Sequence, residues 1–268
     1  MNTGHLPTRF HRIAGPLPAP GELAAEGRAP FETRAPAREG VVDQGGVKLW
    51  YAVWGERGPW LAFAPPFQIV HAALLKATVP YLAQHFRVVT MDPRGNGRSE
   101  RPRGQEHYSF DLYVSDFIAV LDAAGFDRII VETVGVGISA AAMTVLRVAA
   151  EQPQRVSHVI TAGGFADSLH DQPMVAQFVA DELTRMQADW PAYVDGFMRT
   201  IFSEPHSTKP YEDGVRYGWA TSAEVLAWCY RGWLGNDVRA LAQHVACPTL
   251  VIHGDEDGRV LYARGQAI

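Results

Sequence analysis

Short apolar runs alternate with amphipathic stretches over most of the chain. Strands are predicted by apolar and β-branched runs at residues 47–54, 60–64, 87–91, 156–161 and 249–253, and by a run that starts at Ile129. Helices are predicted where apolar residues recur three and four positions apart, at 74–85 with a break near Pro80, at 113–124 and at 140–151. Strands that alternate with helices are typical of βαβ units, so the pattern predicts an α/β fold with a mainly parallel sheet.

Two segments depart from this alternation. Residues 1–38 contain prolines among alanines and charged residues, a composition that cannot offset the entropy lost on ordering, so we expect a flexible arm followed by one domain at 39–268. Residues 165–246 are predicted to be mostly helical and are rich in aromatic residues. Because such an insertion usually lies over the carboxyl ends of the strands, we expect a lid whose aromatic residues mostly pack its own core.

Composition narrows the classes of function. Hydrophobic residues make up 47% of the chain and charged residues 20%, as in a globular protein with a sizeable core. The net charge of −5 gives no electrostatic reason to bind nucleic acid or an anionic membrane. The two cysteines, Cys229 and Cys247, lie in no metal-binding pattern, and no apolar run has the length of a spanning helix. We therefore expect a cytoplasmic protein without a metal.

A serine lies at a predicted junction between a strand and a helix. In the segment Val136–Ala141, Ser139 is surrounded by small residues, which allow the tight turn that holds a serine hydroxyl above a sheet. The backbone N–H of the next residue is then free to stabilise an oxyanion. The segment therefore predicts a nucleophile elbow, although the same serine would also serve as a simple helix N-cap.

Together with three other segments, this elbow resembles the α/β-hydrolase superfamily. The other segments are D-x-R-G-x-G-x-S at Asp92–Ser99, P-x-R-V at Pro153–Val156, and the strand and loop at 248–257. The resemblance covers residues 40–268 and implies an α/β-hydrolase fold with a helical lid. It also implies a serine hydrolase that acts without a cofactor on a carboxylic ester or a related acyl compound, and the aromatic-rich lid favours an apolar one.

The resemblance implies roles for four residues. Ser139 corresponds to the nucleophile, and Asp257, in the pattern H-G-x-x-D, corresponds to the acid that orients a histidine base. The backbone N–H groups of Phe67 and Ala140 would form the oxyanion hole. Phe67 follows two prolines here, but unlike proline it has an N–H to donate.

The register of the elbow has two solutions. Counted forward from Asp127, the nucleophile position falls on Gly135, whereas counted back from Pro153 it falls on Ser139. Four extra residues between these landmarks either lengthen the strand or add a turn to the helix. We favour Ser139, because Val136 to Ser139 reproduces the usual V-G-x-S pattern.

The family's histidine base is missing from its expected position. No histidine follows Asp257, and the family places the base there, beyond one more strand. We therefore expect the last strand and helix of the fold to be absent and catalysis to be impaired. His71 and His206 are the candidate substitute bases, whereas His253, at a strand end, is expected to be structural.

Two further expectations follow from these departures. Without a final strand, the strand at 249–253 would be an exposed apolar edge, which favours self-association. An incomplete triad also leaves an alternative function open, that of a non-catalytic member of the fold that binds a small molecule or a protein.

Overall fold

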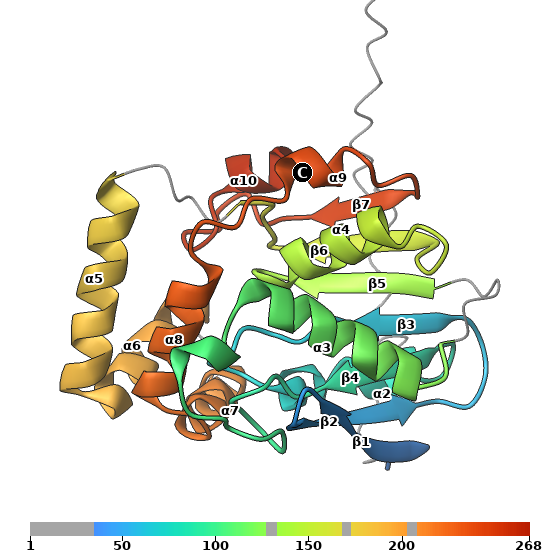
Figure 1. The fold of residues 1–268 in the computed structure, drawn as a ribbon, viewed down its shortest axis with the longest axis horizontal. Coiled ribbons are helices and arrows are strands. Elements are labelled where there is room, and N and C mark those ends of the chain that lie inside the picture. The colour runs from blue at the N-terminus through green and yellow to red at the C-terminus, as the bar shows by residue number, and fades with distance from the viewer. Residues whose placement is uncertain (1–34, 127–132, 168–172, 203–207) are drawn as a thin grey trace, which may run out of the picture. The chain divides into compact units, whose positions relative to one another are not determined.

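The computed structural model describes residues 35–126, 133–167, 173–202 and 208–268, and within these ranges seven strands form one sheet (Figure 1). The strand order is β1-β2-β4-β3-β5-β6-β7. The antiparallel part consists of β1 (Arg38–Gln44), β2 (Val47–Trp54) and β4 (Arg87–Met91). From β4 onward all neighbours are parallel, through β3 (Trp60–Phe63), β5 (Thr133–Ile138), β6 (His158–Ala162) and β7 (Thr249–Ile252).

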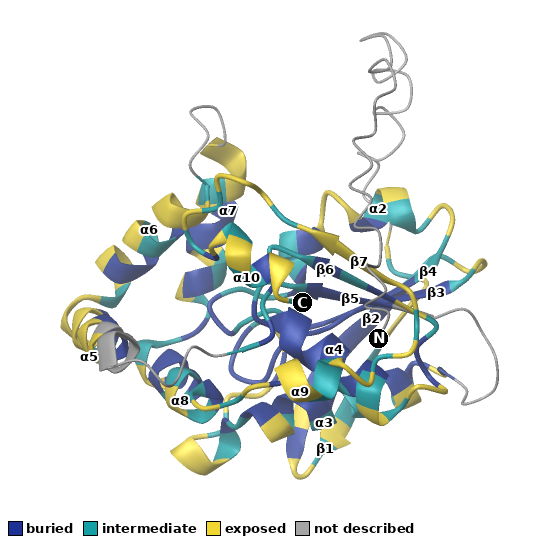
Figure 2. Ribbon diagram, turned by 90° about the horizontal axis from the view of Figure 1, so that it is seen from above, coloured by how far each residue is buried: buried dark blue, intermediate teal, exposed yellow. Residues whose placement is uncertain are grey.

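Helices cover both faces of this sheet. Figure 2 shows α3 (Phe110–Ala123) and α4 (Ala141–Glu151) on one face and the short α2 (Val79–Leu82) on the other. The α3 residues Tyr113, Phe117 and Leu121 are buried in the main core, because they recur at the spacing of one helix face. The remaining short helices are the 3₁₀ helices η1 (Ala72–Leu75) and η2 (Gln105–His107), α9 (Arg239–Ala242) and α10 (Tyr262–Gln266).

Four helices between β6 and β7 form the insertion, and we use that name for them below. They are α5 (Pro173–Ala188), α6 (Trp190–Ile201), α7 (Thr208–Trp219) and α8 (Ala223–Trp233). In Figure 1 the insertion lies beyond the end of the sheet to which the arrowheads of β3 and β5 point. Met186, Tyr193 and Met198 of the insertion form an apolar cluster that also includes Ile69 from the loop after β3. The insertion therefore lies at the carboxyl ends of the parallel strands.

Most predicted elements match the structure, with three differences. The helix predicted at 74–85 is wrong: η1 and α2 replace it, and Pro80 lies in the first turn of α2, where its missing N–H costs no hydrogen bond. Strand β1 was not predicted, because its sequence is half polar and begins at Arg38, inside the expected arm. The strand predicted from Ile129 falls partly outside the described residues, and its observed part is β5.

The strand β7 is an edge of the sheet. It pairs with β6 on one side, and its residues Leu250, Val251 and Ile252 are 54%, 37% and 52% exposed. The expectation of an exposed apolar edge is therefore confirmed. At the other edge, β1 carries charged residues such as Glu39 and Asp43, which disfavour pairing with another chain. No helix in the described part of the chain is long and apolar enough to cross a bilayer.

Candidate active site

Ser139 occupies a sharp turn between a strand and a helix. Strand β5 ends at Ile138 and α4 begins at Ala141, and Ser139 between them has φ = +54°. Among the described residues it is the one non-glycine residue with a positive φ. Because a side chain in this region is sterically strained, such a residue persists only where the surrounding structure enforces it, commonly at functional sites.

The neighbours of Ser139 show how the turn is enforced. The N–H of Ser139 donates to the carbonyl oxygen of Ala162 at the end of β6 (3.0 Å), and the N–H of Ala142 donates to the carbonyl oxygen of Ser139 (3.0 Å). A Cβ at Gly137 would lie 2.6 Å from the backbone of Ala141 and Ala142. The turn therefore requires glycine at 137, and Ser139 is not a helix N-cap, since Ala140 occupies that position.

Gly135, the alternative elbow position, lies within β5. It pairs with Ala62 of β3 and with Val159 of β6, so both its neighbours are strands. The alternative register is therefore wrong as a description of the turn. Ser139, and not Gly135, therefore lies at the junction between the strand and the helix.

The two candidate oxyanion donors follow adjacent strands. Phe63 at the end of β3 pairs with Val136 of β5, so the loop that carries Phe67 lies beside the turn that carries Ala140. Among the described residues, neither backbone N–H has a hydrogen-bond acceptor. The turn around Phe67 is held by the N–H of Val70, which donates to the carbonyl oxygen of Phe67 (3.0 Å). Both groups can therefore donate to a developing oxyanion.

The candidate acid Asp257 lies in the loop after β7. Its Oδ1 accepts hydrogen bonds from the backbone N–H groups of Arg259 and Val260, each at 2.8 Å. A Cβ at Gly163 would lie 3.5 Å from Oδ2 of Asp257, and a Cβ at the next residue, Gly164, would lie 3.6 Å from the carbonyl oxygen of Ser139. Asp257 and Ser139 therefore border the same two-glycine turn after β6.

His253 is the histidine that lies against Asp257. Its Nε2 lies 3.5 Å from Oδ2 of Asp257 and donates a hydrogen bond to the carbonyl oxygen of Val260 (2.7 Å). The ring is buried, and a Cβ at Gly265 of α10 would lie 2.2 Å from its Nδ1. His253 therefore holds the loop of Asp257 against α10, which is the structural role expected for it.

His71, the first substitute base, lies at the N-cap of η1. Its Nδ1 accepts from the N–H of Ala73 (3.4 Å) and lies 3.7 Å from Oδ1 of Asp92. The ring packs edge-on against Tyr217 of α7, with 4.5 Å between the ring centres. Burial lowers the pKa of His71, and the negative charge of Asp92 opposes that shift. His71 is thus held by Ala73, Asp92 and Tyr217, and none of these contacts involves Ser139.

His206, the second substitute base, lies outside the described residues. Within the described ranges, no histidine is hydrogen-bonded to Ser139. The structure therefore brings the candidate nucleophile and acid to one turn but places no imidazole of the described residues between them.

The loop Asp92–Ser99 joins the sheet to α3 and to the insertion. Nε of Arg94 donates to Oδ2 of Asp116 in α3 (2.6 Å), and both side chains are buried. Nδ2 of Asn96 donates to the carbonyl oxygens of Gln68 (2.7 Å) and Tyr217 (3.1 Å). The motif that the sequence singled out is therefore a structural clamp that ties the insertion to the loop of Phe67.

Aromatic residues of the insertion lie directly against Phe67. The ring centre of Phe67 is 5.2 Å from that of Tyr230 and 5.7 Å from that of Trp233, both in α8 and both in edge-on contact. Sequence analysis could not find this contact, since about 160 residues separate the partners along the chain. The insertion therefore forms an apolar wall beside the candidate oxyanion donor.

Comparison with known proteins agrees with this geometry. A family model described as serine aminopeptidase, S33, matches residues 69–268. The chain belongs to this family of α/β-hydrolases. This α/β-hydrolase is 28% identical over 229 residues to 3-oxoadipate enol-lactonase 2 of Acinetobacter baylyi, a match that covers 82% of this chain and 80% of the relative. It is 26% identical over 195 residues to 2-hydroxymuconate semialdehyde hydrolase of a Pseudomonas species, covering 68% and 64%.

Solved structures share the fold of this α/β-hydrolase. A hydrolase from Pseudomonas aeruginosa superimposes with a TM-score of 0.72 at 25% identity, over 87% of this chain and 86% of the other. The enol-lactonase of Burkholderia xenovorans superimposes with a TM-score of 0.73 at 22% identity, over 85% and 86%. These similarities confirm the predicted family and fold class.

Proposed function

We propose that this α/β-hydrolase cleaves a carboxylic ester or a related acyl compound through an acyl-enzyme on Ser139. The observation that carries the proposal is the strained φ of +54° at Ser139, in the turn between β5 and α4. Strain at this position holds a hydroxyl at the carboxyl end of the sheet, beside the N–H groups of Phe67 and Ala140, which have no acceptor among the described residues. The kinship with lactonases and other hydrolases supports the same reaction class.

The chemistry assigns a part to each candidate residue. The Ser139 hydroxyl oxygen attacks the substrate carbonyl carbon, and the N–H groups of Phe67 and Ala140 donate to the resulting oxyanion. Collapse of the tetrahedral intermediate expels the alcohol, and water then releases the acid. Asp257 would stabilise a protonated base. Since no histidine of the described residues is hydrogen-bonded to Ser139, we propose that the hydroxyl is weakly activated and turnover is slow.

Fluorophosphonate labelling tests this proposal. We expect labelling of the purified chain at Ser139, located by intact mass and peptide mapping, and no labelling of the Ser139→Ala variant. If a protein base is missing, added imidazole should raise the labelling rate of the wild type and leave Ser139→Ala unlabelled. A folded wild type that stays unlabelled in imidazole would contradict an activated serine.

Two histidine variants test the substitute bases in the same assay. His71→Asn keeps an acceptor for the N–H of Ala73 and removes the imidazole, so it separates a capping role from a catalytic one. We expect no change in rate for His71→Asn, since its contacts lie with Asp92 and Tyr217. A fall of about 100-fold in His71→Asn or in His206→Asn would identify that residue as the base.

The alternative function is that of a non-catalytic binding protein, and the exposed edge strand β7 favours it. Leu250 and Ile252 are more than half exposed on a strand with one free edge, so a second chain can pair with it. We expect concentration-dependent association in sedimentation velocity, reduced in Leu250→Lys and unchanged in the surface control Leu261→Lys. Equal association of both variants would exclude β7 as the contact.

Two further assignments complete the proposed function. We infer that the insertion acts as a lid over the site, supported by the contacts of Tyr230 and Trp233 with Phe67. We also propose that the hydrolase is cytoplasmic, since its two cysteines are unpaired, Cys229 in a buried position.

A further inference from the structure

The side chain of Arg259 extends from the loop that carries Asp257 to the insertion. Its backbone N–H donates to Oδ1 of Asp257 (2.8 Å). Its guanidinium carbon lies 4.3 Å from the ring centre of Phe197 in α6. The side chain therefore places a positive charge between the candidate acid and the wall of the insertion.

The N–H groups of the Arg259 guanidinium are available to bind a ligand. Within the described residues, no carboxylate lies within 4.0 Å of it and its side chain makes no hydrogen bond. Other arginines of this region are paired, for example Arg185 with Glu182 and Arg264 with Asp167. A ring that covers one face of a guanidinium leaves its N–H edge open to an anion.

A continuous aromatic surface connects Arg259 with the candidate oxyanion donor. Phe67 contacts Tyr230, which packs in the same apolar cluster as Tyr193. Tyr193 contacts Phe197 at 6.2 Å between ring centres, and Arg259 lies over Phe197. Burial, and then Tyr230, raise the pKa of Tyr193, and the positive charge of Arg259 opposes the shift, which is the electrostatic sign of its proximity.

Among the described residues, the other charged groups near these aromatic residues have partners, whereas the guanidinium of Arg259 has none. Glu182 accepts from the Tyr193 hydroxyl (2.7 Å) and is paired with Arg185, so its charge is already satisfied. Oδ1 of Asp257 accepts hydrogen bonds from two backbone N–H groups, and its Oδ2 lies 3.5 Å from Nε2 of His253. Arg259 is therefore a cation that adjoins both the loop of the candidate acid and the aromatic residues of the insertion, without a charged partner among the described residues.

We propose that Arg259 binds a carboxylate on the acyl part of the substrate, so that this hydrolase acts on half-esters or lactones of dicarboxylic acids. The inference rests on the proposed function, and it replaces a purely apolar substrate by one with an apolar chain and an anionic end. The planar fork of a guanidinium matches the two oxygens of a carboxylate, whereas a neutral acyl end leaves it unpaired.

Binding to a variant that cannot form an acyl-enzyme tests this inference independently of turnover. The probes are monoethyl glutarate and ethyl 5-methylhexanoate, which have the same number of heavy atoms in the acyl chain and differ in the charge at its end. In the Ser139→Ala background, we expect isothermal titration calorimetry to show about 10-fold tighter binding of the anionic probe. Adding Arg259→Met should remove this preference, because methionine keeps an apolar contact with Phe197 and loses the charge.

A matched control separates this site from the overall charge. Arg103 has an 86% exposed side chain, so Arg103→Met removes the same charge from the surface and should leave the preference unchanged. Equal binding of the two probes, a preference that survives Arg259→Met, or no detectable binding of monoethyl glutarate would each overturn the inference. Thermal melts of each variant verify that it is folded.

Turnover by the chain with Ser139 intact distinguishes this inference from the proposed function. If only the proposed function is wrong, the anionic probe should still bind in a way that depends on Arg259, but neither ester should release ethanol. If only the inference is wrong, both esters should be hydrolysed, and the ratio of kcat/KM for the anionic ester to kcat/KM for the neutral ester should be the same in the wild type and in Arg259→Met. If both hold, Arg259→Met should lower kcat/KM for the anionic ester about 10-fold and leave the neutral ester unchanged.

Discussion

The backbone N–H of Ser139 donates a hydrogen bond of 3.0 Å to the carbonyl oxygen of Ala162. Ala162 ends β6, and the two glycines that follow it separate Ser139 from Asp257. This bond fixes the strained turn to the neighbouring strand, so the position of the candidate nucleophile depends on the sheet more than on its own helix.

Gly137 lies too close to the backbone of α4 to carry a side chain. Gly137→Ala should lower the free energy of unfolding by about 1–3 kcal/mol, because a Cβ would lie 2.6 Å from the backbone of α4 and force the helix start away from β5. It should also abolish labelling of Ser139. Gly196→Ala in α6 is the control: no atom lies within 4 Å of its Cβ, so it should stabilise by about 0.5–1 kcal/mol. Urea titrations measure both.

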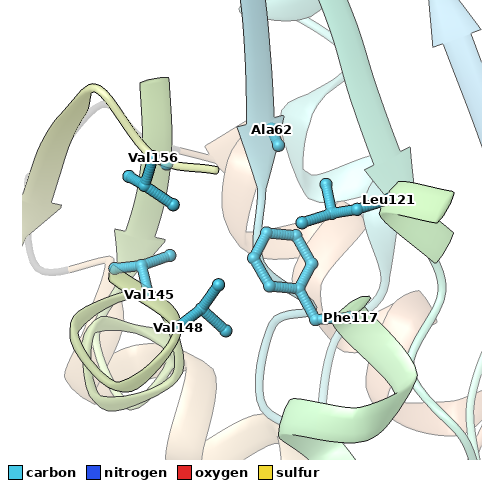
Figure 3. Close-up of a pocket in the computed structure, with 7 residues that line it drawn as sticks. Ala62, Phe117, Leu121, Val145, Val148 and Val156 are labelled. Carbon is cyan, nitrogen blue, oxygen red and sulfur yellow. The ribbon is translucent and has the colours of Figure 1, made fainter. Parts of the chain in front are cut away.

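A small apolar cavity lies beside Gly135. Its volume is about 10 Å³, and its lining includes Ala62, Phe117 and Val145 from the sheet, α3 and α4 (Figure 3). A Cβ at Gly135 would lie 3.7 Å from Val145 and Val156, in ordinary contact. Gly135→Ala should therefore raise the free energy of unfolding by about 0.5–1 kcal/mol in urea titrations. A loss of stability would show that the strand cannot accept a side chain here.

The buried pair Arg94 and Asp116 clamps the Asp92–Ser99 loop to α3. Arg94→Met or Asp116→Leu alone should destabilise by about 3–5 kcal/mol, because each leaves a buried charge without its partner. The double variant should be more stable than either single variant, since it leaves no buried charge. Additive losses in chemical denaturation would contradict a coupled pair.

The same pair predicts a pH dependence. Burial raises the pKa of Asp116 to about 6, although Arg94 opposes the shift. The unfolded carboxyl titrates near 4, so between these values the folded protein binds a proton that the unfolded chain does not. The contribution of Asp116 to stability is therefore lost as the pH rises through about 6. Relative to the double variant, the wild type should become more stable from pH 7 to pH 5, as measured by denaturation at both pH values.

Gln68 follows Phe67 and carries a fully buried amide. Its Nε2 and Oε1 have no hydrogen-bond partner among the described residues. Gln68→Met should therefore raise the free energy of unfolding by about 1 kcal/mol, because it replaces an unsatisfied amide by an apolar group of similar length. The exposed Gln84→Met should change it by less than about 0.5 kcal/mol. A lower Tm for Gln68→Met would reveal that the amide has a partner in solution.

The fold class, the family and the positions of most strands followed from the sequence, because they depend on local patterns. Runs such as 47–54 and 87–91 are apolar enough to be buried wherever the chain places them. Strand β1 was not predicted, because an edge strand need not be apolar. Its extended structure comes from pairing with β2. The helix predicted at 74–85 failed because proline starts a helix as readily as it interrupts one.

By itself, the sequence determined which residue types could carry the chemistry: a serine among small residues, an acid after a late strand, and an oxyanion loop with one usable N–H. Tertiary structure alone decided the register, because only the pairing of Gly135 with Ala62 and Val159 shows that Gly135 lies inside β5 and leaves Ser139 at the turn that follows. It also brought Ser139 and Asp257 to one turn and placed Arg259 over Phe197, contacts between residues far apart in the chain. Long-range contacts are fixed by the packing of whole elements, which no local pattern encodes.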